Sequence, residues 1–356
     1  MVLTNFARPK VNLTLKVLGR RPDGYHELES LVVFAAGIAD KLTLTPGAPV
    51  GVRAFGPFAE AIAGENLAAA ALRRLGETEP RLVLGSIELE KVVPVSAGLG
   101  GGSSDAAAVL RLVRRANPDL ARVVDWLALA ATLGADVPVC FEDRAALVSG
   151  IGERVRPLAD CPRVPAVLVN PMTEVPAAKT AEVFRQLGAP TFGRDDEKRA
   201  QLERGGTALS SSVPGSCGQA AATGDLPQSG AGTPLASTPP GKAPARRAEA
   251  LRPGTLTSGE ESSPSLVLRS FRDSGSLIDY LRDHGNDLTA PARALMPVID
   301  DVLDELARAP GTLLARLSGA GPTAFGLYAS GFAALAAARQ ITLRRPGWWV
   351  QPVWLG

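Results

Sequence analysis

A run of glycines directly before a run of alanines constrains this chain more than any other stretch. It reads VPVSAGLGGGSSDAAAVL, from Val93 to Leu110, and the part after the glycines predicts a helix over 103–115. Glycine loses much conformational freedom on folding, so several in a row are costly unless the backbone needs a special turn or a close approach. The N-terminus of a helix offers free N–H groups and a positive dipole end, which bind anions. A phosphate-binding loop is therefore favoured, and a flexible turn is the alternative.

The loop matches neither of two common nucleotide-binding motifs. The Gly-Lys-Ser/Thr ending of a Walker A loop is absent, and Ser103 stands where G-x-G-x-x-G has its third glycine. Ser103 or Ser104 is the expected N-cap of the following helix, with Asp105 in its first turn. A second glycine turn, LSGAGPTAFG at 317–326, has strand patterns on both sides and predicts a hairpin.

Hydrophobic periodicity elsewhere predicts a mixed α and β chain. Residues 11–17 alternate, with Val and Leu on one face and polar residues on the other, which predicts a half-buried strand. Further strands are predicted within 25–34, 81–93, 135–141, 144–158, 165–171, 311–330 (two strands) and 347–356. Further helices are predicted over 117–134, 180–188 and 331–343, with at least one more within 276–311, where two are favoured.

The predicted elements fall into two domains. We place the first at 1–155 and the second at 156–356, the latter a small sheet with helices on one side. Between about 205 and 264 there is no aromatic residue, Ile or Met, and Ser, Thr, Gly, Pro and Ala dominate. Such a segment buries too little apolar surface to offset its ordering entropy, so it predicts a disordered insertion.

Composition argues against several classes of function. The formal net charge of +2 on 356 residues gives no support to a nucleic-acid or anionic-membrane partner. Cys140, Cys161 and Cys217 have no paired spacing, which argues against disulfides or a thiolate metal site and fits a reducing compartment. Neither a signal-peptide pattern nor an apolar run of membrane-spanning length is present, so we expect a cytoplasmic protein. The oligomeric state stays open.

Several polar residues have ordinary structural explanations when each is taken alone. A lysine such as Lys10, on the polar strand face that it shares with Asn12, is usually solvated. Asp136 follows a helix-ending glycine and suits a turn or cap. His26 is one of two histidines, and a lone histidine is more often structural than catalytic. The pair Asn286–Asp287 is favoured as a helix N-cap.

Taken together, these stretches resemble the GHMP small-molecule kinases. The family's phosphate motif, P-x-x-x-G-L-G-(G)-(G)-S-S, fits Pro94–Ser104 throughout. Its C-terminal glycine motif is similar to SGAGPTAF, and its N-terminal strand is similar to ARPKVNLTL. The resemblance implies an α+β fold of two domains, the first like ribosomal protein S5 and the second ferredoxin-like, with the active site in the cleft between them.

One branch of the family is similar in more detail. RPDGYHEL resembles the branch that phosphorylates the 2-hydroxyl of a cytidylylated methylerythritol in non-mevalonate isoprenoid biosynthesis. The resemblance implies that Asp136 is the catalytic base and Lys10 its partner beside the substrate hydroxyl, with Asn12 nearby. It implies that Tyr25 stacks on the cytosine ring and that His26 hydrogen-bonds its edge.

The resemblance also implies the remaining binding residues. Thr180 and Phe184 would complete the base pocket. ATP is the co-substrate, and Mg²⁺ is expected on its phosphates with Ser104 as a candidate contact, although no carboxylate motif marks a dedicated metal site. The residues implied for ATP are Asn66, Lys91, Pro94, Gly98, Leu99, Gly100, Gly101, Gly102, Ser103 and Ser104.

Two alternatives and two departures from the family stand beside this interpretation. Another GHMP kinase acting on homoserine or mevalonate would have no base for Tyr25 and His26 to bind. A non-catalytic nucleotide sensor would have no need of Lys10 and Asp136. The insertion at about 205–264 is unusual for the family, and Thr289 stands where the family often has Glu.

Overall fold

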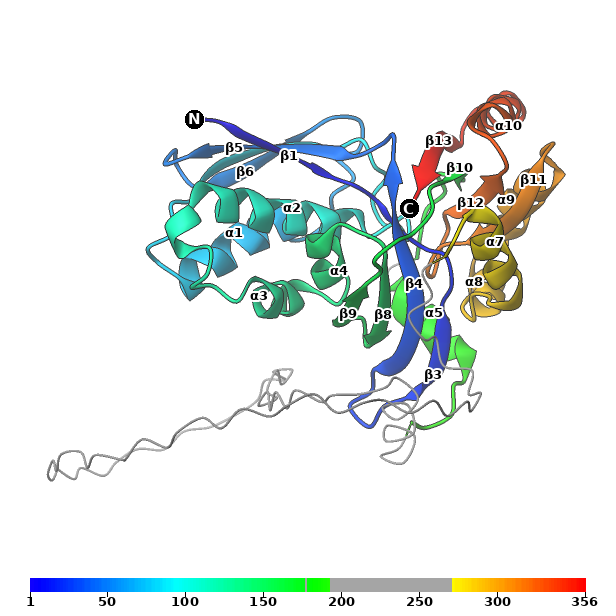
Figure 1. Cartoon of the computed structure of the whole chain (residues 1–356), viewed down its shortest axis with the longest axis horizontal. Coiled ribbons are helices and arrows are strands. Elements are labelled where there is room, and N and C mark those ends of the chain that lie inside the picture. The colour runs from blue at the N-terminus through cyan, green and yellow to red at the C-terminus, as the bar shows by residue number, and fades with distance from the viewer. Residues whose placement is uncertain (177, 193–270) are drawn as a thin grey trace, which may run out of the picture. The chain divides into compact units, whose positions relative to one another are not determined.

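The computed structural model describes residues 1–176, 178–192 and 271–356. These residues belong to one compact unit, coloured from blue to red along the chain in Figure 1. The insertion predicted at about 205–264 lies outside the described residues. Within the described residues, no helix is both long and apolar enough to cross a membrane.

A four-stranded sheet with helices packed on one face forms the N-terminal part of this unit. Its strand order is β1 (Leu3–Ala7), β5 (Asp40–Pro46), β7 (Gly85–Glu90) and β6 (Gly51–Phe55), and only the β6–β7 pair is parallel. Helices α1 (Leu67–Thr78) and α2 (Gly101–Ala116) lie along one face of this sheet (Figure 1). Apolar residues of β5 and β7 form one core with α1, α2, α3 (Trp126–Leu133) and α4 (Val137–Glu142), because alternate strand residues face the helices.

A larger sheet of nine strands, counted within the described residues, runs through the rest of the unit. The path is β11 (Thr312–Leu317), β12 (Ala324–Tyr328), β10 (Val164–Asn170), β13 (Trp349–Leu355), β4 (His26–Ala36), β8 (Ala146–Gly150) and β9 (Arg154–Pro157). Two short strands, β2 (Lys10–Asn12) and β3 (Lys16–Arg20), also pair with β4. Strand β4 therefore joins the N-terminal and C-terminal parts of the chain in one sheet (Figure 1). The division at residue 155 stays a prediction.

Helices cover both faces of the C-terminal part of this sheet, not one face as predicted. Val167 and Val169 of β10 pack against α9 (Val298–Arg308) and α10 (Gly331–Arg344). Ala166 and Leu168, which point the other way, share a core with α7 (Ser274–Asp283). Every residue of β10 is buried, which is the pattern of a strand covered on both sides.

Two predicted elements take another form. Residues 135–141, predicted as strand, contain helix α4, with Pro138 in its first turn, where the missing N–H costs nothing. The predicted helix over 117–134 is instead a short 3-10 turn, η1 (Pro118–Leu120), followed by α3. Helix α3 begins late because the Asp125 side chain accepts a hydrogen bond from the Ala128 N–H and caps a new helix there.

Helix boundaries differ from the predictions at two further places. The N-cap of α2 is Gly100, so Ser103 and Ser104 lie inside the helix and are not caps, and Asp105 lies beyond the first turn. Residues 276–311, where at least one helix was predicted and two were favoured, contain parts of three helices, α7, α8 (Thr289–Leu295) and α9. The predicted hairpin over 317–326 is confirmed, since β11 and β12 pair antiparallel around it.

The first predicted strand departs from its pattern in a way that bears on function. Pairing with β4 stops after Asn12 and resumes at Lys16, and every residue from Lys10 to Leu15 is buried. The polar face, which carries Lys10 and Asn12, is therefore covered and not solvated. Burying a lysine ammonium is costly unless it has partners, so its surroundings define the site.

Candidate active site

The glycine loop between β7 and α2 needs glycine at two positions. Gly98 and Gly100 have φ angles of +80° and +63°, a region that residues with a Cβ rarely occupy. A Cβ on Gly98 would lie 2.6 Å from the Gly321 carbonyl oxygen, and one on Gly100 would lie 2.7 Å from Lys10 Cγ. The loop therefore packs directly on the second glycine turn and on the Lys10 side chain.

Hydrogen bonds hold the glycine loop against β2 and against the second glycine turn. The Lys10 N–H donates to the Leu99 carbonyl (2.9 Å), and the Thr323 N–H donates to the Ala97 carbonyl (3.2 Å). The Ser318 hydroxyl donates to the Gly98 carbonyl at 3.3 Å. The second glycine turn is thus part of the site and more than a link between β11 and β12.

Asn286 fixes the second glycine turn and also bonds to the start of the next helix, where its Oδ1 accepts from the Leu288 N–H at 3.0 Å, although the N-cap residue itself is not Asn286 as predicted. Its Nδ2 donates to the carbonyls of Leu317 (3.0 Å) and Gly319 (2.8 Å). The N-cap of α8 is Leu288, which has no side-chain cap. Asp287 accepts a hydrogen bond from the Val17 N–H at 2.8 Å instead of capping the helix.

The structure brings Lys10, Asn12 and Asp136 together. Lys10 Nζ lies 3.2 Å from Asp136 Oδ2 and donates to Asn12 Oδ1 at 2.7 Å. Asn12 in turn donates from Nδ2 to the Ser30 hydroxyl (2.8 Å), which orients its amide. The Lys10 side chain is buried, whereas that of Asp136 is 40% exposed. A fixed ammonium thus lies beside a carboxylate that a ligand can reach.

A pocket of about 780 Å³ opens around this pair. It is lined by the following predicted site residues: Lys10, Asn12, Gly98, Gly100, Ser103, Asp136, Thr180 and Phe184. The lining also includes Lys179, at the start of α5 (Lys179–Leu187), which the sequence analysis missed. Its sequence context, KTAEVF, gives no signal that its ammonium lies against the glycine loops.

A second pocket of about 660 Å³ lies next to the first and is lined by Tyr25, His26, Thr180 and Phe184. The rings of His26 and Phe184 stack with centroids 4.8 Å apart, while Tyr25 is 61% exposed. Burial, with a smaller effect of the Arg20 charge, lowers the pKa of His26 below its usual value. His26 is therefore mainly a neutral imidazole at neutral pH, which both donates and accepts hydrogen bonds.

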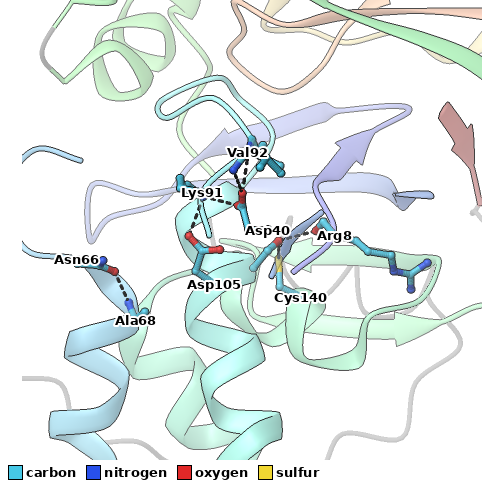
Figure 2. Close-up of polar contacts among 10 residues, drawn as sticks. Arg8, Asp40, Asn66, Ala68, Lys91, Val92, Asp105 and Cys140 are labelled. Atoms are coloured by element: carbon cyan, nitrogen blue, oxygen red, sulfur yellow. Dashed lines mark hydrogen bonds and ion pairs between the residues drawn. The ribbon is translucent and has the colours of Figure 1, made fainter. Parts of the chain in front are cut away.

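Lys91 and Asn66 have structural partners (Figure 2). The Lys91 ammonium lies 2.5 Å from Asp40 Oδ2 and 2.7 Å from Asp105 Oδ2, and its side chain is 2% exposed. Burial alone would lower the pKa of Lys91, but the two carboxylates together outweigh burial and raise it. The ammonium therefore faces these two acids, and Lys91 does not line either pocket. Asn66 caps α1 by accepting from the Ala68 N–H at 2.9 Å.

Other predicted loop residues lie behind the pocket surface. Leu99 is fully buried, and the Ser104 hydroxyl donates to the Arg8 carbonyl at 2.8 Å. Ser104 therefore lies outside the lining of the pocket, where a metal contact would be. The remaining residues of this group, which line neither pocket, are Pro94, Gly101 and Gly102. The described part of the chain contains no group of three or more His, Cys, Asp or Glu residues placed to hold a metal ion.

We expect G98A to lower kcat/KM for ATP about 10- to 100-fold, because the added Cβ displaces either the glycine loop or the Gly321 turn. Steady-state kinetics with varied ATP measures the loss. G47A is the matched control, because Gly47 has a similar φ of +76° but nothing within 4 Å of an added Cβ. Equal losses in both variants would contradict the role given to the contact between the loops.

Comparison with known proteins defines first the class and then the family. Residues 66–144 match the N-terminal domain of the GHMP kinases, and residues 264–344 match the GHMP kinase C-terminal domain. The chain is thus a GHMP kinase, which confirms the predicted fold class. It is 42% identical to a 4-diphosphocytidyl-2-C-methyl-D-erythritol kinase of Rhodopseudomonas palustris, over 98% of this chain and 96% of that protein.

Two further relatives agree on the family. A protein of the same name from Dinoroseobacter shibae is 39% identical over 98% of this chain and 94% of its own length. A crystal structure of 4-(cytidine 5'-diphospho)-2C-methyl-D-erythritol kinase covers 99% of both chains at a TM-score of 0.62 and 29% identity. The chain belongs to the 4-diphosphocytidyl-2-C-methyl-D-erythritol kinases, so the predicted enzyme class, with ATP as co-substrate, is confirmed.

Proposed function

We propose that this kinase transfers the terminal phosphoryl group of ATP to the 2-hydroxyl of 4-diphosphocytidyl-2-C-methyl-D-erythritol. The observation that carries the proposal is the continuity of the two pockets. The residues that line both pockets are Leu28, Ile151, Thr180, Ala181 and Phe184. One substrate molecule can therefore place its base in the pocket of Tyr25 and His26 and its alcohol beside Asp136. A small alcohol without a base, such as homoserine or mevalonate, would leave the second pocket empty.

The chemistry follows from the Lys10–Asp136 pair. Asp136 accepts the proton of the substrate hydroxyl as the oxygen attacks the terminal phosphorus of ATP. Lys10, held by Asn12 and the ion pair, orients the carboxylate and stabilises negative charge on the attacking oxygen. The pair has no evident use in a non-catalytic sensor, which argues for catalysis.

The glycine loop supplies the other half of the reaction. In this proposal the backbone N–H groups of Gly98, Gly100 and Ser103, the predicted loop residues that line the main pocket, donate to the ATP phosphates, and the α2 N-terminus adds its positive dipole end. In this proposal Lys91 acts on the nucleotide indirectly, because its ammonium fixes the Asp40 carboxylate. Asp40 in turn accepts hydrogen bonds from the N–H groups of Val92 (2.6 Å) and Val93 (2.8 Å) and so holds the start of the loop. Asn66 stays a proposed nucleotide contact through its position at the start of α1.

Mg²⁺ is proposed to arrive bound to the ATP phosphates. The residues present fit this better than a dedicated protein site, because among the described lining residues Asp136 is the one carboxylate and Ser104, the expected contact, does not line the pocket. When bound, the ion neutralises charge on the transferring group. We propose that the enzyme works in the cytoplasm on its two small-molecule substrates, without nucleic-acid or membrane partners.

The proposal is tested by incubating the full chain with Mg-ATP and the cytidylylated substrate, then locating the new phosphate by phosphorus-31 and proton NMR. We expect stoichiometric ADP and a phosphate monoester on the 2-hydroxyl carbon. A phosphate on another hydroxyl would overturn the placement of the 2-hydroxyl at Asp136. If ADP formed no faster than it does by ATP hydrolysis without the cytidylylated compound, the proposed substrate would be wrong.

We expect H26A to raise KM for the cytidylylated substrate about 5- to 30-fold, because a buried hydrogen bond to the base edge is lost. KM for ATP should stay within about twofold, since His26 does not line the main pocket. H284A is the control, because His284 lies at the end of α7 and bonds to the Tyr280 carbonyl. A change confined to ATP would contradict the assignment of the second pocket.

A further inference from the structure

Lys179 is a buried cation in the main pocket that the mechanism above does not use. It is the first residue of α5 and is 7% exposed. Its ammonium donates to the Ser96 carbonyl at 3.1 Å and to the Gly321 carbonyl. Its side chain thus reaches the contact between the glycine loop and the second glycine turn.

Among the described residues, none balances the charge of Lys179. In the described part of the chain its hydrogen-bond partners are two neutral carbonyl groups and no carboxylate. Burial lowers the pKa of Lys179 to about 8, and the nearby Lys10 charge acts in the same direction. A charged group buried without a counter-ion is costly, so a ligand that supplies negative charge would relieve that cost.

The pocket as a whole has the same imbalance. Among the described residues that line it, the charged ones are Lys10, Lys179 and Asp136. Lys10 is paired with Asp136 at 3.2 Å, so Lys179 is the excess positive charge. An ammonium has three donors, and the two carbonyls use two of them, which leaves one for a ligand.

We infer that Lys179 binds a phosphate oxyanion in the main pocket, as a second cation beside Lys10. The inference rests on the proposed function, because the two proposed substrates are the two sources of that oxyanion. One source is the terminal phosphate of ATP, because Ser96 belongs to the glycine loop. The other is the diphosphate of the cytidylylated substrate, because Lys179 directly precedes Thr180 and shares α5 with Phe184 in the base pocket.

The test compares K179M and K179R with wild type in equilibrium binding by calorimetry. The probes are ADP, an ATP analogue with an imido bridge between the last two phosphates, and the cytidylylated substrate. We expect K179M to weaken at least one ligand about tenfold or more, and K179R to keep most of that affinity, since arginine preserves the charge and donors. K41M is the control, because Lys41 is an exposed lysine of β5.

The set of ligands that lose affinity in K179M shows which phosphate Lys179 binds. Weaker binding of the ATP analogue with unchanged ADP assigns Lys179 to the terminal phosphate. Weaker binding of the cytidylylated substrate alone assigns it to the substrate diphosphate. Unchanged affinity of K179M for all three probes overturns the inference and leaves Lys179 as a brace between two carbonyls.

A second readout does not depend on the folding of K179M. An anion beside the Lys179 ammonium favours its charged form, so wild type should take up at most about half a proton on binding at pH 8. Calorimetry in two buffers of different ionisation enthalpy measures this uptake. K179R should lose it, because arginine is already charged, and equal uptake by both proteins overturns the inference. The inference is separable from the proposed function, because wild-type turnover of the cytidylylated substrate tests the function without any Lys179 variant.

Discussion

D136N should lower kcat about 10²- to 10⁴-fold while the enzyme still binds ATP. The carboxylate is the one acid among the described residues that line the main pocket, and it is held at 3.2 Å from the Lys10 ammonium. Asparagine has nearly the same shape but accepts no proton, so the attacking hydroxyl keeps its proton in the transition state. Single-turnover phosphoryl transfer measures the chemical step, and calorimetric titration with the ATP analogue measures binding.

The effect of D136N should not arise through the fold. Asp136 is the N-cap residue of α4 but makes no side-chain cap hydrogen bond, so its replacement by an amide leaves the helix start unchanged. D119N is the control, because Asp119 lies exposed in η1 and lines neither pocket. If D136N kept more than about a tenth of wild-type kcat, general-base catalysis by Asp136 would be wrong.

K91M should destabilise the fold by about 3–5 kcal/mol, which corresponds to a fall in melting temperature of about 10 °C. The Lys91 ammonium lies between Asp40 and Asp105, and all three side chains are almost fully buried. Methionine has a similar length but leaves two buried carboxylates facing each other without a cation. Chemical denaturation with a two-state analysis measures the loss.

The charges of the Asp40–Lys91–Asp105 cluster make the K91M prediction specific. Burial raises the pKa of Asp105 to about 7, even though Lys91 opposes this effect. Adding D105N to K91M removes one of the two uncompensated carboxylates, so the double variant should recover part of the lost stability. K41M, on the exposed side of β5, should change stability by less than about 1 kcal/mol. If K91M were no worse than K41M, the cluster would not be stabilising.

The sequence could predict the glycine loop because its signal is local. Consecutive glycines before an alanine helix are visible within a few residues, whereas the roles of Tyr25 and His26 are implied only by the resemblance to the GHMP kinases. The burial of Lys10 was not predictable in this way. An alternating strand shows which residues share a face, but the glycine loop that covers the polar face lies some 90 residues further along the chain.

The contacts missed by the sequence analysis depend on long separations. Lys91 meets Asp40 across 51 positions, and Lys179 meets Gly321 across 142. Hydrophobic periodicity does not predict such pairs, because it depends only on residues that are close in the sequence. The prediction for 135–141 failed for another reason, since a short apolar run fits a buried strand and a buried helix equally well. There Pro138 in the first turn was the available signal for a helix.

The most direct test of the account is a comparison of kcat/KM for four alcohols under Mg-ATP. These are the cytidylylated methylerythritol, the methylerythritol phosphate without cytidine, homoserine and mevalonate. We predict that the cytidylylated compound exceeds each of the others by about 10³-fold or more, because only it fills both pockets. A comparable or higher kcat/KM for any alcohol without the base would contradict the account, since the pocket of Tyr25, His26 and Phe184 would then have no part in substrate selection.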